Sequence, residues 1–230
     1  FLNKFYSLFE KHSSKDNSKD KLLETKINIL IKDVTELTES MVYNLAIIKI
    51  IEFVNFFHIN KENFSSKLYK ESLEKLILIT SPFAPHICEE IHEKLGKKGF
   101  VSTQKYPKYD NKKIDNKLLE GERIIDSVIE DINNLIKLVK FIPKKAKLYI
   151  SEDWKYLLFN KLKDEKSRNI GELMKKYIDN KYNEEIKKII FSFSKGNLNI
   201  YDTNKEIEKN VLMINLQDLE NKFKFKIEIH

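Results

Sequence analysis

Residues 81–96, with the sequence SPFAPHICEEIHEKLG, indicate a fixed corner between two packed helices. Two prolines three residues apart, Pro82 and Pro85, stop the preceding helix. Pro85 suits the first turn of a new helix, where its missing N–H costs nothing. Apolar residues then recur at steps of four, and Gly96 follows as a plausible C-cap. The new helix therefore buries one stripe, formed by Ile87, Ile91 and Leu95.

The residues before this corner predict an antiparallel helical bundle. Apolar steps of four and three favour an amphipathic helix over 21–38. Residues 41–58 are apolar nearly all round, so we expect them to form the most buried helix. The remaining predicted elements are a short helix over 1–11, a flexible polar loop over 12–20, a polar turn over 59–63, and helices over 64–80 and 86–95. Short connections between such helices are typical of an up-down bundle.

Beyond the corner the pattern changes twice. Residues 96–116 suggest an extended strap over the bundle, and 118–141 a long helix that Pro143 ends. The rest predicts a small α/β module, with helices over 152–162, 170–178 and 182–193 and strands around 146–150, 198–201, 211–214 and 223–229. The predicted fold is mainly α. Its domains are a bundle over 1–120, a connecting helix over 121–142 and the module over 143–230.

Composition limits the class of protein. A chain of 230 residues with 41% hydrophobic and 33% charged residues suits a soluble globular protein without a membrane span. The single cysteine, Cys88, cannot form an internal disulfide, so we expect a cytoplasmic location. A net charge of +7 permits an RNA partner without demanding one. Because the chain begins with Phe1 inside a helical pattern, we expect it to be part of a longer protein.

Catalytic and metal motifs are weak in this sequence. Glu89 and His92 have the spacing of carboxylate-bridged metal sites, but the second such pair that these sites need is missing. Cys88 near His86 lacks an accompanying oxyanion-hole pattern, so a structural thiol is the better interpretation. No phosphate-binding or dinucleotide-binding loop occurs. We expect neither a catalytic site nor a metal or cofactor in these 230 residues.

Binding signals lie in the second half of the chain. Lysines gather at the junction after Pro143, and an aromatic segment with Trp154 follows. Lysines with exposed rings are typical of RNA contacts, with lysines for phosphates and rings for stacking. The alternative is that Trp154 packs in the core of the module and the lysines are merely solvated. The candidates are Lys144, Lys145, Lys147 and Lys155, together with Lys222, Lys224 and Lys226 along one face of the last predicted strand.

The corner closely resembles the signature of the anticodon-binding helical domain in class Ia aminoacyl-tRNA synthetases. That pattern runs Pro-Phe-x-Pro-His-x-x-Glu-Glu and later reaches Trp-Pro or Tyr-Pro, here Tyr106-Pro107. Tyr43-Asn44-Leu45-Ala46-Ile47 looks like a further family element. His92 departs from the family, which usually has Trp there. The signature residues carried over, which we expect to be structural, are Pro82, Pro85, His86, Glu89, Glu90 and Ile91.

Residues 142–156 narrow the resemblance to one group of class Ia synthetases. The run Pro143-Lys144-Lys145 before a strand, then Trp154-Lys155, is similar to the C-terminal region of archaeal and eukaryotic leucyl-tRNA synthetases. The resemblance implies tRNA(Leu) as partner, approached at its elbow and long variable arm. It also implies a catalytic domain of the same enzyme, outside this chain, that uses ATP and Mg. It adds the tail to the candidates, with His230.

The sequence leaves two alternatives open. The first is the tail of another class Ia synthetase, the valyl, isoleucyl or methionyl enzyme. The second is a helical module without enzymatic function that binds another protein.

Overall fold

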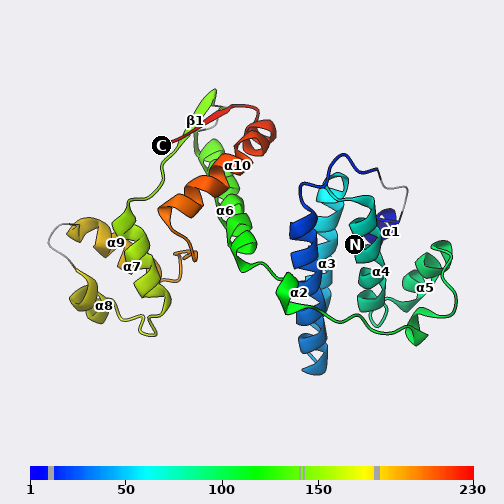
Figure 1. Ribbon diagram of the computed structural model, residues 1–230. Helices are drawn as coiled ribbons and strands as arrows, with labels where there is room; N and C mark the ends of the chain where they lie inside the picture. Colours follow the sequence, from blue (N-terminus) through cyan, green and yellow to red (C-terminus); the bar gives the residue numbers. More distant parts are fainter. Residues whose placement is uncertain (10–12, 140, 142, 179–181) are drawn as a thin grey trace. The chain divides into compact units, whose positions relative to one another are not determined.

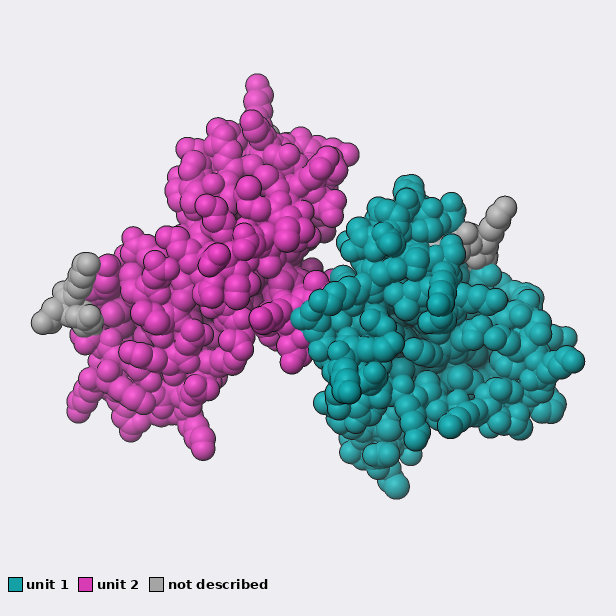
Figure 2. Space-filling view, in the orientation of Figure 1, with its two compact units in different colours: residues 1–115 teal, residues 116–230 magenta. Residues whose placement is uncertain are grey.

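The computed structural model describes residues 1–9, 13–139, 141, 143–178 and 182–230. It divides into two compact units, residues 1–115 and residues 116–230 (Figure 2). The sequence predicted a boundary at residue 120 and a separate connecting helix over 121–142. In the structure that helix begins at Asn116 and is part of the second unit. The predicted helix end lies partly outside the described residues, at 140 and 142.

The first unit is the predicted helical bundle, in which α2 packs against both α3 and α4 (Figure 1). The corner helix α5 contacts α4 and α1. A single apolar core joins these helices, and its fully buried members include Phe5, Leu23, Ile31, Phe57, Leu76 and Ile91. The elements are α1 (Leu2–Ser7), α2 (Asp20–Glu39), α3 (Tyr43–Asn60), η1 (Lys61–Asn63), α4 (Ser66–Thr80), α5 (Pro85–Lys94), η2 (Val101–Thr103) and η3 (Asn111–Lys113).

The corner forms as its residues predict. Pro85 occupies the first turn of α5, after the N-cap residue Ala84. Gly96 has a φ of 69°, the left-handed conformation that a C-cap glycine adopts at low cost. Two backbone bonds close this end of the helix, from Gly96 to the carbonyl of Glu93 and from Lys97 to that of His92.

The helix predicted to be most buried is not. On α3, five residues are buried, whereas α2 buries eight. Met41, just before α3, and Leu45 and Ile48 within it have exposed fractions of 77, 45 and 46%. The main partners of α3 are α1, α2 and η1, so one side of the helix is covered. Because α3 is apolar nearly all round, the sequence predicted too much burial for this helix. Composition does not reveal how many neighbouring helices pack against it.

The predicted flexible loop is held in place where the structure describes it. Within residues 13–19, the backbone N–H of Lys15 donates to the carbonyl of Glu62 at 2.7 Å. That of Lys19 donates to the carbonyl of Asn63 at 3.2 Å, and Asp16 accepts from Ser18 at 3.0 Å. A polar sequence predicted mobility, but its backbone finds partners on η1, and residue 12 lies outside the described part.

The strap crosses the bundle as predicted, with η2 and η3 as its short helical turns. Val101 is buried near α4 and α5. Two buried polar side chains of α2 hold the later part. The Asn28 oxygen accepts from the Asp110 N–H at 2.8 Å, and the Thr25 hydroxyl donates to the Lys113 carbonyl at 3.1 Å.

The second unit combines helices with a two-stranded sheet. The strands are parallel and pair Lys145 with Lys226 through to Leu148 with Ile229. One apolar cluster joins α6, α10 and the sheet, and another joins α7, α8 and α9. The elements are α6 (Asn116–Val139), β1 (Lys145–Leu148), α7 (Asp153–Lys163), α8 (Ile170–Tyr177), α9 (Asn183–Ser194), α10 (Lys205–Phe223) and β2 (Lys226–Ile229).

Three strand predictions in this unit need correction. Residues 198–201 form no regular strand, and Leu198 and Ile200 pack against the α7–α9 cluster instead. Residues 211–214 lie inside α10, because a short apolar run does not distinguish helix from strand. The last strand spans only Lys226–Ile229, since α10 continues to Phe223 and Lys224 ends it in a left-handed conformation.

Candidate nucleic-acid interface

The outer face of the sheet carries three of the seven predicted lysines. Parallel strands place register partners on the same face, and side chains alternate along each strand. Ala146 and Leu148 therefore point with Ile227 into the α6–α10 cluster, and Ile229 lies on the same face of the sheet. The opposite, solvent-facing side is formed by Lys145, Lys147, Lys226 and Glu228.

Only part of this positive charge is neutralised. Lys145 forms an ion pair with Glu228, and the Nε2 of His230 lies 3.5 Å from the same carboxylate. The pKa of Glu228 is lowered by its hydrogen bond to Lys145 first, and by His230 to a lesser degree. Lys147 and Lys226 have no ion-pair partner among the residues that the structure describes.

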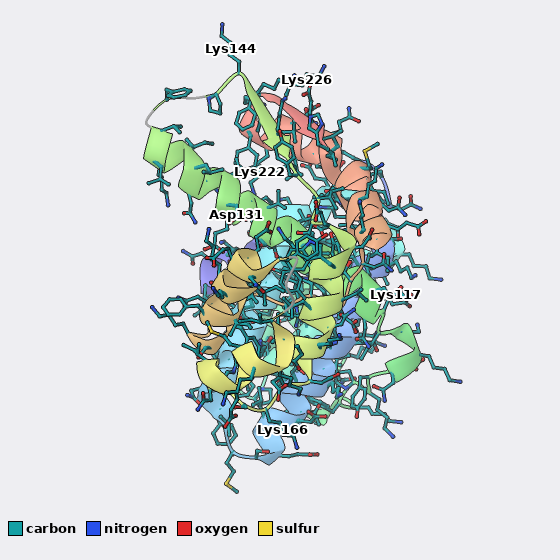
Figure 3. The ribbon with its side chains drawn as sticks, turned by 90° about the vertical axis from the view of Figure 1, so that its left-hand side faces the viewer. Lys117, Asp131, Lys144, Lys166, Lys222 and Lys226 are labelled. Carbon is teal, nitrogen blue, oxygen red and sulfur yellow. The ribbon has the colours of Figure 1, made fainter. Side chains whose placement is uncertain are left out.

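The lysines at 144, 222 and 224 lie around the sheet rather than on one strand face. Lys144 precedes β1, Lys222 belongs to α10 and Lys224 is its C-cap residue. The prediction that Lys222, Lys224 and Lys226 line one face of a strand is therefore wrong. All three are nevertheless exposed, and Figure 3 shows Lys144, Lys222 and Lys226 at the end of the unit that holds the sheet. We call Lys144, Lys147, Lys222, Lys224 and Lys226 the sheet lysines.

Tyr149 is exposed beside these lysines, although it was not among the predicted candidates. Its side chain is 75% exposed and stacks on His230, with ring centroids 5.5 Å apart. Backbone bonds hold the two rings, because Ile150 donates to the His230 carbonyl at 2.9 Å and His230 donates to the Leu148 carbonyl at 2.8 Å. The sequence contains a signal for the exposure of Tyr149. Ala146, Leu148 and Ile150 alternate as inward-facing residues, so Tyr149, between the last two, should point outward.

Lys155 and Trp154 do not join this surface. Both lie on α7, and the Lys155 ammonium is bound to Glu185 at 2.7 Å. The Trp154 ring stacks on Tyr182 with centroids 4.4 Å apart, and its Nε1–H donates to Glu152 at 2.7 Å. Of the two interpretations of Trp154, the structure favours packing against the α7–α9 cluster.

Three of the six signature residues, Glu89, Glu90 and Ile91, hold the bundle together. Both oxygens of Glu89 accept from the N–H of Val101. Glu90 accepts from the Tyr6 hydroxyl at 3.2 Å and from Lys94 at 2.9 Å. Ile91 is fully buried, whereas Pro82, Pro85 and His86 are exposed.

Neither the thiol nor the histidine of the corner forms a chemical site. Cys88 is buried, and burial raises the pKa of its thiol to about 12, so it stays protonated. His92 is 6% exposed, and its Nδ1 has no partner in the described part of the chain. No cluster of three metal-ligating side chains occurs among the described residues.

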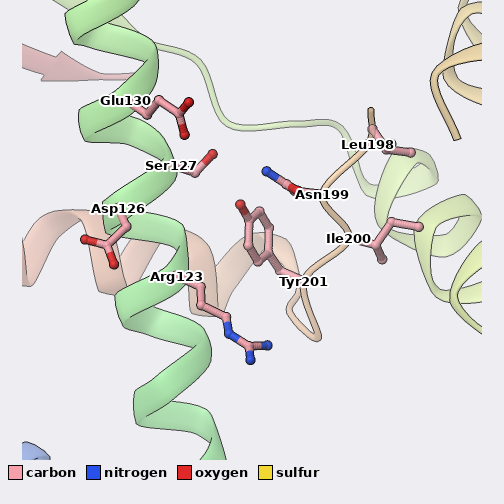
Figure 4. Close-up of a pocket in the computed structure, with 8 residues that line it drawn as sticks. All are labelled: Arg123, Asp126, Ser127, Glu130, Leu198, Asn199, Ile200 and Tyr201. Carbon is pink, nitrogen blue, oxygen red and sulfur yellow. The ribbon is translucent and has the colours of Figure 1, made fainter. Parts of the chain in front are cut away.

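The second unit also has an open cleft of about 440 Å³ between α6 and residues 198–201 (Figure 4). Its charged groups are two carboxylates, Asp126 and Glu130, and Arg123, which is already bonded to Glu120 at 2.9 Å. This balance disfavours an RNA phosphate. The lining residues are Arg123, Asp126, Ser127, Glu130, Leu198, Asn199, Ile200 and Tyr201.

The family follows from a comparison with known proteins. The model of the anticodon-binding domain of tRNA ligase matches residues 20–153, more than half of the chain. The chain belongs to this family. The match begins at α2 and runs through the corner, the strap and β1, so it includes the signature residues.

Curated relatives of this anticodon-binding-domain protein are leucine–tRNA ligases of archaea. That of Methanocaldococcus jannaschii is 34% identical over 68% of this chain and 18% of the relative. That of Methanococcus maripaludis strain C7 is 32% identical over 71% of the chain and 19% of the relative. The ligase of Pyrococcus abyssi is 28% identical over the whole chain and 25% of its own length. These similarities confirm the resemblance in the sequence, and the chain spans about a fifth to a quarter of these relatives. Among the described helices, none has an apolar stretch that could cross a bilayer.

Proposed function

We propose that this chain is the tRNA-binding part of a leucine–tRNA ligase. It would hold tRNA(Leu) for aminoacylation by a catalytic domain outside these residues, where ATP and Mg would bind. The observation that carries the proposal is the set of sheet lysines, five exposed cations without ion-pair partners in the described structure, in a chain related to leucine–tRNA ligases.

The chemistry of this surface suits an RNA backbone. Exposed ammonium groups bind phosphates and release condensed counterions, which gives affinity that falls with salt. The stacked pair of Tyr149 and His230 adds an exposed ring beside these cations, and a ring can stack on an unpaired base. We propose that the surface meets the elbow and long variable arm of tRNA(Leu).

Titration of tRNA(Leu) at several salt concentrations tests the proposal. The double variant Lys147→Gln/Lys226→Gln removes two sheet lysines, and the salt slope should fall by roughly one for each phosphate that is no longer bound. The matched control, Lys161→Gln/Lys166→Gln, removes two exposed lysines of the same unit that also lack ion-pair partners in the described structure. Equal loss of affinity in both variants would reject the sheet surface.

A second comparison tests which part of the tRNA the chain contacts. The wild-type chain should bind tRNA(Leu) more tightly than the same tRNA without its long variable arm. Equal affinity for the two would rule out the variable arm. If the chain has no measurable affinity for either tRNA, a protein-binding module becomes the better interpretation.

The exposed side of α3 supports the catalytic domain as a protein partner. Leu45 and Ile48 are each nearly half exposed and lie three residues apart, on one side of the helix. Contiguous exposed apolar side chains of this kind often mark a protein contact. Leu45→Glu/Ile48→Glu in the complete ligase should lower aminoacylation, while the tRNA affinity of the 230-residue chain stays unchanged. Unchanged aminoacylation would reject this contact.

A further inference from the structure

We propose that the strap, residues 96–116, is a second RNA-binding surface, one that binds an unpaired stretch of tRNA. This inference rests on the proposed function, because it assigns another surface of the chain to the same class of ligand. All of the strap except Asn116 belongs to the first unit and the sheet lysines belong to the second, so the two surfaces can be tested independently.

The strap has a surplus of positive charge. It contains six lysines and two aspartates. Lys97 is bound to Glu74 at 2.8 Å, and Lys113 to Glu24 at 2.7 Å. The other four lysines are exposed, and none has an ion-pair partner in the described part of the chain: Lys98, Lys105, Lys108 and Lys112.

Neither aspartate cancels this charge by binding a strap ammonium group. The Asp110 carboxylate accepts from the backbone N–H of Lys112 at 2.9 Å. Asp115 is bound to Lys21 of α2 at 2.6 Å. The four ammonium groups are therefore available to phosphates, which are the strongest anionic ligands that an RNA chain offers.

Aromatic rings lie between these lysines in the sequence. Phe100 is 70% exposed and Tyr109 is 37% exposed. A large apolar ring has no packing reason to face water, but it can stack on an unpaired base. Tyr106 is also 40% exposed, but its hydroxyl is hydrogen-bonded to Thr35 of α2 and burial raises the pKa of that hydroxyl, so one edge of this ring is held against the bundle. Lysines interleaved with exposed rings are typical of surfaces for single-stranded RNA.

The backbone of the strap is fixed by groups that the bundle buries. Glu89 holds Val101 at the start, and Asn28 holds Asp110 near the end. Asn28 is 2% exposed, so its amide is dedicated to this contact and to the Glu24 carbonyl. A fixed backbone presents its side chains without the full entropy cost of ordering a loop on binding. Long ordered loops of this kind are usually functional.

The charge test uses two matched double variants of the 230-residue chain. Lys105→Gln/Lys108→Gln should lower the affinity for a tRNA(Leu) transcript and reduce its salt slope by about two, at roughly one for each phosphate contact. The control, Lys67→Gln/Lys70→Gln, removes two exposed lysines of α4 in the same unit that lack ion-pair partners in the described structure. Thermal melting followed by circular dichroism verifies that both variants fold.

The ring test separates stacking from charge. Phe100→Ala should weaken binding roughly fivefold or more, the loss expected for one stacked base, and Phe100→Leu should not restore it. Phe100→Tyr, which keeps an aromatic face, should restore it. Ile59→Ala is the control, because Ile59 is a similarly exposed apolar residue of the same unit, at 77%.

The outcomes distinguish this inference from the proposed function. If the wild-type chain binds tRNA but both strap variants behave as their controls do, the strap is not a binding surface and the sheet lysines stand alone. If Lys105→Gln/Lys108→Gln weakens binding while Phe100→Ala does not, the contact with an unpaired base is wrong. If the wild-type chain binds no tRNA at any salt concentration, both proposals fail.

Discussion

The backbone N–H of Val101 donates to both carboxylate oxygens of Glu89, at 3.0 Å to Oε1 and 2.9 Å to Oε2. This contact ties the corner helix α5 to the first turn of the strap, which lies twelve residues further along the chain. In the sequence, Glu89 has the spacing of a metal ligand, but in the structure it fixes the backbone of the strap at Val101. Its role explains why the signature and the strap occur together in one folding unit.

Glu89→Gln should loosen the strap without unfolding the bundle. A hydrogen bond to a charged acceptor contributes about 1.5–3 kcal/mol, and a neutral amide accepts more weakly. We expect faster amide hydrogen exchange in residues 100–104, measured by mass spectrometry. Glu93→Gln on the exposed side of α5 should leave this exchange unchanged. Equal protection in the two variants would show that Glu89 does not hold the strap.

Ile91→Asp should destabilise the first unit strongly. Ile91 is fully buried, so the substitution places a carboxylate in an apolar core and costs about 3 kcal/mol or more. Ile59→Asp, at a position 77% exposed, should cost less than about 1 kcal/mol. Thermal melting followed by circular dichroism compares the two. A melting temperature of Ile91→Asp equal to that of the wild type would contradict the packing of α5.

The Cys88 thiol should resist labelling in the folded protein. Burial raises its pKa to about 12, so at pH 8 almost none of it is the reactive thiolate. A disulfide reagent such as Ellman's should react slowly with the native chain and rapidly in concentrated urea. Immediate labelling of the native chain would mean that Cys88 is accessible.

The same pKa shift makes stability depend on pH. The folded state keeps the thiol protonated, while the unfolded state loses the proton above the ordinary pKa of 9.0. The wild type should therefore lose stability relative to Cys88→Ala as pH rises from about 9 toward 12. Paired melting curves at pH 8 and pH 10 measure how this difference changes with pH: at pH 8 it should contain only the cost of removing the buried side chain, and at pH 10 the wild type should have lost stability relative to the variant. A constant difference at both values would refute the shift.

Trp154→Ala should lower the stability of the second unit but not its RNA affinity. The ring is partly buried and stacks on Tyr182, so its removal costs about 2 kcal/mol, whereas Trp154→Phe keeps much of the stacking. Circular dichroism and tRNA titration measure the two properties. If the variant lost tRNA affinity while its melting temperature stayed unchanged, Trp154 would be an RNA-binding residue and not a packing residue.

The helices of the bundle could be predicted because two signals agree. The spacing of apolar residues indicates a helix, and prolines and glycines mark where it begins and ends. Pro85 and Gly96 mark the two ends of α5, and the structure places Pro85 in the first turn and Gly96 directly after the C-cap residue Leu95, in a left-handed conformation. Burial was harder to predict, since Ile48 is as apolar as Ile50 yet faces away from the neighbouring helices. The spacing of apolar residues shows which side chains a helix could bury. Which of them are buried depends on where the neighbouring helices pack.

The second unit was less predictable from its sequence, for two physical reasons. Residues 211–214 are apolar throughout, which suits helix and strand equally. The alternation over 223–229 looks like one strand, but it begins inside α10 and turns at Lys224, where φ is 63°. All five sheet lysines were among the predicted candidates, but the sequence did not predict the sheet face that Lys147 and Lys226 share. Lys155 was a candidate by proximity in sequence alone, and Glu185 occupies its ammonium group.

The parallel pairing of β1 with β2 has a consequence for synthesis of the chain. At roughly 5–20 residues per second, the ribosome makes β1 several seconds before β2 exists. During that interval the inward face of β1, with Ala146 and Leu148, lacks the partner that covers it in the finished unit. The residues of the bundle, by contrast, have all been made before α6 begins. The first unit can therefore fold while the chain is still growing, whereas the surface that carries the sheet lysines can form only after β2 has been made.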